Sequence, residues 1–138
     1  MSKYKFQTEF EINASKKMLY PYLNSASGLS QWFAEDVTIN EDKVFNFKWD
    51  GEDHKAKIAA QRTNHFIKFE FVSDNGNSSH ENGEEEEDPS YVELKLDMNE
   101  LTQSVFLTVI DYSDSDDFEE LQDVWESLVH NLKEIVGG

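Results

Sequence analysis

The spacing of apolar residues changes once along this chain, and that change limits the folds open to it. Over most of residues 3–12 and 37–112, apolar side chains recur at every second position. Between residues 118 and 136 they recur at spacings of three and four. A period of two predicts strands with one buried face, and the later spacing predicts one amphipathic helix about 30 Å long. We therefore expect a set of strands followed by a single long helix.

The first strand is the most regular of the series. Along residues 3–12, one face carries the apolar side chains and Thr8, and the other carries Lys3, Lys5, Gln7, Glu9 and Glu11. Further strands are predicted over 37–39, 44–50, 54–62, 65–73, 90–98 and 103–112, with a turn at residues 50–51. Between the first two strands, residues 16–23 and 27–33 predict two short helices, the former bent or broken at Pro21.

This order of elements predicts an α+β fold with an antiparallel sheet. Strands and helices do not alternate, which disfavours a parallel sheet. One helix cannot cover six to seven twisted strands, so the sheet must curve around it and leave a gap between them. Trp32 and Phe33, at the end of the second short helix, are expected to close that gap near Phe118 and Leu121.

Composition sets the class of protein. A length of 138 residues predicts one domain over residues 1–138, and the lack of cysteine excludes disulfides and thiolate chemistry. A net charge of −17 argues against nucleic acid and anionic membrane surfaces as partners. No apolar run predicts a signal peptide or membrane insertion, so we expect a cytoplasmic protein. Residues 74–89 hold much of the negative charge and predict an acidic, flexible hairpin loop.

The sequence contains few candidates for metal-binding or catalytic residues. His130 stands between Glu126 and Glu134 at helical spacing, but this pattern is common on helix surfaces, and we expect no metal there. Residues 111–117 (DYSDSDD) lack the glycine and closing glutamate of a calcium loop and fit a helix N-terminus better, with Asp116 as the cap. We therefore expect no cofactor and no catalytic residue. Asp50, Asp97 and Asp111 lie near strand ends, so an acid–base pair inside the cavity stays open.

Three stretches resemble a known family. They are FEINASKKMLYPYLNSASGLSQWF (10–33), AKIAAQRTNHFIKFEF (56–71) and VWESLVHNLKEIV (124–136). Together they resemble the Bet v 1-like, START-related superfamily (SRPBCC), in particular the branch related to the activator of Hsp90 ATPase and small bacterial START-like proteins. The resemblance implies a helix-grip fold, in which the sheet and the last helix commonly enclose a cavity for an apolar ligand.

The leading hypothesis is therefore non-catalytic binding of a small hydrophobic or lipid-like molecule between the sheet and the last helix. The expected lining residues are mostly aromatic: Trp32, Phe45, Phe47, Trp49, Phe69, Phe71, Leu94 and Trp125. Thr108, Tyr4 and Asn46 are the candidates for polar groups in the cavity. The competing interpretation is an ordinary aromatic core that the protein's own side chains fill.

Two other functions stay open at this point. The first is a chaperone-binding module resembling the Hsp90 activator, in which acidic residues 84–88 meet a basic protein partner. The second is an enzyme like the polyketide cyclases of this fold, which would need a polar pair deep in the cavity. Residues 103–110 are apolar on both faces, which fits either a second covered face or a dimer contact, so the chain is expected to be a monomer or a homodimer.

Overall fold

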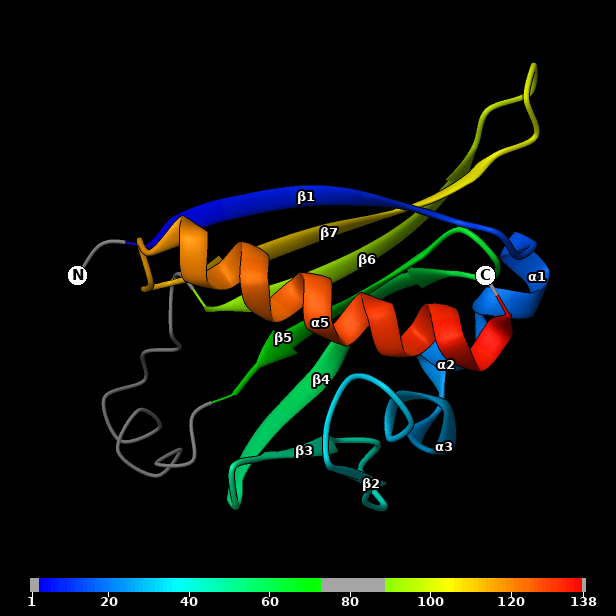
Figure 1. Ribbon diagram of the computed structural model, residues 1–138. Helices are drawn as coiled ribbons and strands as arrows, with labels where there is room; N and C mark the ends of the chain where they lie inside the picture. Colours follow the sequence, from blue (N-terminus) through cyan, green and yellow to red (C-terminus); the bar gives the residue numbers. More distant parts are fainter. Residues whose placement is uncertain (1–2, 73–88, 138) are drawn as a thin grey trace, which may run out of the picture.

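A curved antiparallel sheet wraps around one long helix in the computed structural model, which describes residues 3–72 and 89–137 (Figure 1). In these residues the sheet has seven strands in the order β1-β7-β6-β5-β4-β3-β2. The strands are β1 (Tyr4–Ile12), β2 (Asp36–Ile39), β3 (Phe45–Trp49), β4 (Glu52–Arg62), β5 (Phe66–Phe71), β6 (Tyr91–Met98) and β7 (Val105–Ser113). The helices are α1 (Lys16–Leu19), α2 (Pro21–Asn24), α3 (Ala26–Leu29) and α5 (Phe118–Val136). This confirms the α+β helix-grip prediction; residues 74–88 of the predicted acidic loop lie outside the described residues.

The region between β1 and β2 holds three helical turns where two short helices were predicted. Pro21 occupies the first position of α2, where its missing N–H costs nothing, and this separates α1 from α2. The hydroxyl of Ser15 accepts the amide N–H of Met18 at 3.0 Å and caps α1. Ser25 caps α3 in the same way through Gly28, also at 3.0 Å. Side-chain caps therefore hold helices that are too short to be stable alone.

The β3–β4 hairpin is closed by the predicted two-residue turn. Asp50 and Gly51 have φ values of 53° and 79°, the positive pair that a type I′ turn requires. Farther along β4 the pairing register shifts between Ile58 and Ala60. A bulge of this kind bends a strand, which helps the sheet to curve around α5.

The last helix, α5, has its cap one residue later than predicted. Asp117, rather than Asp116, accepts the amide N–H of Glu120 at 3.1 Å. The helix ends at Gly137, whose φ of 84° is the left-handed conformation that favours glycine. Its buried stripe includes Trp125, Val129 and Leu132, which belong to the core between helix and sheet.

Candidate functional site

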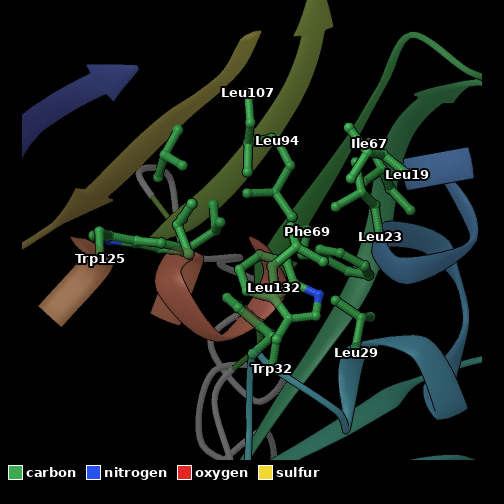
Figure 2. Packing of buried hydrophobic residues seen from close by; sticks show 14 of the residues in the cluster. Leu19, Leu23, Leu29, Trp32, Ile67, Phe69, Leu94, Leu107, Trp125 and Leu132 are labelled. Atoms are coloured by element: carbon green, nitrogen blue, oxygen red, sulfur yellow. The ribbon is translucent and has the colours of Figure 1, made fainter. Parts of the chain in front are cut away.

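The eight predicted lining residues meet in one cluster on the concave side of the sheet. Six of them are buried in the core, and Trp49 and Phe71 are partly buried and pack against it. They come from β3, β5, β6, α5 and the turn after α3. Figure 2 shows Trp32, Phe69 and Leu94 near Leu132, with Trp125 nearer the amino terminus of α5. Strand alternation selected the members from β3, β5 and β6, whereas Trp125 followed from the helical spacing of α5 and Trp32 lies outside any regular element.

Phe47 and Phe33 hold the rings of this cluster together. The ring centroid of Phe47 lies 5.1 Å from that of Phe33, 5.4 Å from Phe69 and 5.5 Å from Trp49. Phe33 also contacts the ring of Trp125 at 5.7 Å, which links the turn after α3 to the long helix. The prediction that Phe33 meets the first turn of this helix is wrong in one respect: the ring of Phe118 lies against Phe6, 5.5 Å away.

Protein side chains fill the centre of the cluster. Phe47, Phe69 and Leu94 each have an exposed fraction of 0%. A void large enough for a water molecule would leave part of its wall exposed, so no such void adjoins these three side chains. In this conformation the rings therefore occupy the space that the sequence predicted as a cavity. A ligand could enter only if side chains or α5 moved.

Each of the three tryptophans is fixed by a hydrogen bond from its indole N–H. Trp32 Nε1 donates to the carbonyl of Tyr22 at 2.9 Å, and Trp49 Nε1 donates to the carbonyl of Phe33 at 2.7 Å. Trp125 Nε1 donates to Asp111 Oδ2 at 2.9 Å. Aromatic side chains with a satisfied N–H give rigid apolar walls without leaving a polar group unpaired.

Asp111 is the predicted strand-end carboxylate that points toward the concave side. Its neighbours across the sheet are Phe6 on β1 and Val92 on β6, both buried. Burial raises the pKa of the Asp111 carboxyl above its usual range, and the hydrogen bond from Trp125 partly opposes that rise. The side chain therefore places a desolvated carboxyl beneath α5 and ties the helix to β7.

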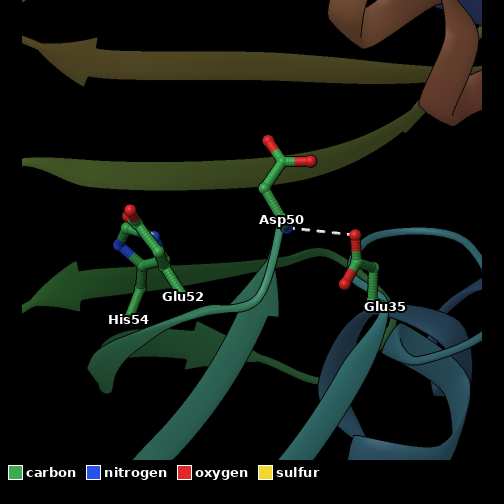
Figure 3. Close-up of polar contacts among 4 residues, drawn as sticks. All are labelled: Glu35, Asp50, Glu52 and His54. Atoms are coloured by element: carbon green, nitrogen blue, oxygen red, sulfur yellow. Dashed lines mark hydrogen bonds and ion pairs between the residues drawn. The ribbon is translucent and has the colours of Figure 1, made fainter.

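A partly exposed aromatic rim adjoins the cluster at the β3–β4 hairpin. The ring of Trp49 lies 5.3 Å from His54 and 6.3 Å from Phe71. Polar side chains lie at the same hairpin: Glu35 Oε2 accepts the backbone N–H of Asp50 at 3.0 Å (Figure 3). His54 Nε2 also lies 3.9 Å from Glu52 Oε1, two residues earlier on β4. Apolar rings thus approach solvent next to charged side chains, an arrangement typical of the mouth of a binding site.

Two of the three polar residues predicted to line the cavity lie on the opposite face of the sheet. Thr108 pairs across the sheet with Glu9 and Lys95, whose side chains are exposed on the convex face, so it cannot line an inner cavity. Asn46 likewise alternates with the inward-facing Phe45 and Phe47 and points outward. Tyr4, at the outer end of β1, is 38% exposed.

A hollow of about 860 Å³ lies at the other end of the sheet, between the end of β1, the β6–β7 turn and the last turns of α5. Its apolar floor includes Ile12 and Val105, which also belong to the core. Its charged lining residues are of both signs, Lys16 and Lys133 on one hand and Glu9 and Glu11 on the other. None of the eight predicted lining residues takes part. This hollow, called the groove below, was not predicted from the sequence because its walls come from segments far apart in the chain.

Neither a metal site nor a membrane span is visible in the described residues. His130 Nε2 contacts Glu134 Oε2 at 3.2 Å on an exposed part of α5, whereas Glu126 accepts a hydrogen bond from Gln122. Within residues 3–72 and 89–137, His, Asp and Glu side chains form no group of three that could hold a metal ion. In the same residues no helix is both long and apolar enough to cross a bilayer.

Solved structures share this fold. The Aha1 dimer from Colwellia psychrerythraea superposes with a TM-score of 0.71 at 16% identity, covering 96% of both chains. BfR322 from Bacteroides fragilis is 34% identical over 98% of this chain and 92% of its own, with a TM-score of 0.59. DynU16, from the dynemicin biosynthetic locus, is 13% identical over 94% of this chain and 46% of its own, with a TM-score of 0.69.

The family is identified by comparing the sequence with known families. No curated protein matches the chain. The family model for the START-like superfamily domain matches residues 1–138, the whole length of the sequence. With the curved sheet, the long last helix and the Bacteroides fragilis relative, this match shows that the chain belongs to the START-like superfamily.

Proposed function

We propose that the chain binds a small apolar or lipid-like molecule between the sheet and α5, without chemical conversion. The observation that carries the proposal is the convergence of the eight predicted lining side chains on one apolar cluster under that helix. Membership of the START-like superfamily supports it, since this fold commonly holds hydrophobic ligands. Asp111 is partnered at the cluster by the indole N–H of Trp125, which does not ionise, so these two groups do not form an acid–base pair.

Binding at this place requires the closed cluster to open. The contacts that must loosen are the ring contact between Phe33 and Trp125 and the hydrogen bond between Trp125 and Asp111. The rim around Trp49 and Phe71 is the natural entrance, because these rings are only partly buried. A ligand would then replace ring–ring contacts with ligand–ring contacts, so little apolar surface would be exposed in the bound state. Because opening precedes binding, we expect association well below the diffusion limit.

The test is a titration with the neutral fluorescent probe N-phenyl-1-naphthylamine. We expect saturable 1:1 binding with energy transfer from tryptophan. Phe71→Ala, at the inner rim, should weaken binding at least about tenfold because an aromatic wall is lost. Phe106→Ala is the matched control, since Phe106 is also a half-buried aromatic residue but alternates with inward-facing neighbours on β7.

Three results would count against the proposal. The first is the absence of saturable binding to the folded chain, and the second is equal weakening by the two alanine variants. The third is binding that changes with Lys133→Glu and not with Phe71→Ala, because it would place the ligand in the groove at the end of β1. Native mass spectrometry of gently purified protein should also show an added mass that organic solvent removes.

A further inference from the structure

Within residues 3–72 and 89–137, the first strand, β1, leaves one long edge of the sheet open. It pairs with β7 over its whole length of nine residues and is the terminal strand in the sheet order. It contains neither glycine nor proline, and its register shows no shift. Figure 1 shows it at the upper margin of the sheet. An edge of this length is a template for pairing with another strand, and the opposite edge, β2, has only four residues.

The charges on the outward face of β1 are ordered in a way that suits a second copy of the same strand. Read from the amino terminus, Lys5 comes first, the neutral Gln7 stands in the middle and Glu9 follows. Lys3 and Glu11 extend the same order at either end. An antiparallel copy centred on Gln7 places Lys5 opposite Glu9 of the other chain, and Lys3 opposite Glu11. Opposite charges directly across a sheet are stabilising, whereas a strand of uniform charge would repel its own copy.

The other face of β1 agrees with this register. Pairing about Gln7 sets Tyr4 opposite Phe10 of the second chain, and Phe6 opposite Thr8. Tyr4 is 38% exposed and Phe10 is half-buried, so both rings would gain burial from the contact. Aromatic cross-strand pairs are among the stabilising ones.

Neighbouring registers are less favourable. Centring the pair on Thr8 sets Glu9 opposite Gln7 and Lys3 opposite Asn13, so only Lys5 keeps an acidic neighbour, Glu11. Shifting the other way, about Phe6, sets Lys5 opposite Gln7. The pairing about Gln7 is therefore the register in which both lysines face glutamates.

We propose that β1 is the interface of a homodimer, in which two β1 strands pair antiparallel about Gln7 and join the two sheets into one. The contact is isologous, so it closes at two chains and does not propagate into a filament. The net charge of −17 opposes association of two chains at long range. Salt at about 0.15 M screens this repulsion beyond about 8 Å, whereas the facing Lys–Glu pairs lie closer together than that. This interface is independent of the ligand proposal, because it uses the edge of the sheet and not its interior.

Charge reversal tests the register by sedimentation velocity in about 0.15 M salt, with the protein taken up to about 1 mM. Lys5→Glu and Glu9→Lys should each raise the dimer dissociation constant at least about tenfold, because a two-fold contact contains each pair twice. The double variant carrying both changes should return to the native value. Lys17→Glu and Glu41→Lys are exposed controls with the same changes in net charge and should leave the dimer unchanged.

Cysteine crosslinking tests the geometry, which is straightforward in a chain without native cysteine. Gln7→Cys should form a disulfide-linked dimer under mild oxidation, because the two positions face each other across the proposed two-fold axis. Lys5→Cys alone should not, since it faces Glu9. A native chain that stays monomeric at about 1 mM would overturn the proposal. So would equal crosslinking of the two variants, or a dimer that the charge reversals leave intact.

Discussion

Replacing Asp111 with alanine tests how firmly α5 is fastened to the sheet. The change removes the acceptor of the 2.9 Å hydrogen bond from Trp125, a residue only 3% exposed, and leaves its indole N–H buried without a partner. An unsatisfied buried donor costs about 1–3 kcal/mol, and relief of the buried carboxylate offsets part of that loss. We expect a net loss of about 1–2 kcal/mol, which at this chain length lowers Tm by several degrees.

The asparagine variant separates the hydrogen bond from the charge. Asp111→Asn keeps an acceptor oxygen of the same shape and removes the ionisable group. Because burial raises the pKa of Asp111 in the folded chain, the folded state binds a proton at a higher pH than the unfolded state does. Stability contributed by this group is therefore lost as pH rises through the folded pKa and regained as pH falls toward the unfolded value of about 3.9. Asp111→Asn should be at least as stable as the native chain near neutral pH, and its advantage should shrink on acidification.

Urea unfolding of the three proteins, followed by circular dichroism at several pH values, measures both effects. Equal stability of Asp111→Ala and the native chain at neutral pH would contradict the role of the hydrogen bond. A stability difference between the native chain and Asp111→Asn that does not change with pH would contradict the raised pKa of Asp111.

Three further sets of substitutions probe packing and capping, each measured by denaturant unfolding. Phe69→Ala should lower the free energy of unfolding by about 3–5 kcal/mol, since this ring is fully buried and its deletion leaves a cavity. Ala56→Leu, at an equally buried site, should lower it by about 1–3 kcal/mol through overpacking, and a stabilised variant would reveal an unfilled interior. Asp117→Ala should cost about 1 kcal/mol through loss of the α5 cap, whereas Asp116→Ala should change stability much less; equal effects would contradict the cap assignment. Gly28→Ala should be strongly destabilising, because its Cβ would stand 2.3 Å from a backbone oxygen of α2, and a stable variant would show that α2 and α3 can separate.

Periodicity was enough to predict the fold wherever one face of an element is buried. The alternation along β1 and the three-and-four spacing of α5 each report which side of the element meets the core. The order of those elements then left a curved antiparallel sheet around one helix as the arrangement that covers both. The predicted break at Pro21 was also confirmed, since the lack of an N–H there is a local property.

The site was predicted less completely, for identifiable reasons. Apolar residues on both faces of β7 hid the orientation of Thr108, which only its pairing partners Glu9 and Lys95 reveal. Asn46 could have been assigned correctly, because it alternates with two inward-facing phenylalanines. Phe33 lies in a turn without periodicity, so its central place in the cluster is a tertiary property. The partnership of Asp111 with Trp125 depends on how α5 crosses the sheet.

The proposal that an apolar molecule binds between the sheet and α5 is tested most directly by nuclear magnetic resonance of the indole N–H groups during titration with dodecanoate. Trp49 Nε1–H and Trp125 Nε1–H lie at the rim and under α5, and both are hydrogen-bonded in the closed cluster. We predict that these two signals shift together and saturate at one ligand per chain. Unchanged indole signals, with shifts confined to Ile12 and Val105 at the groove or to the convex face, would contradict the proposal.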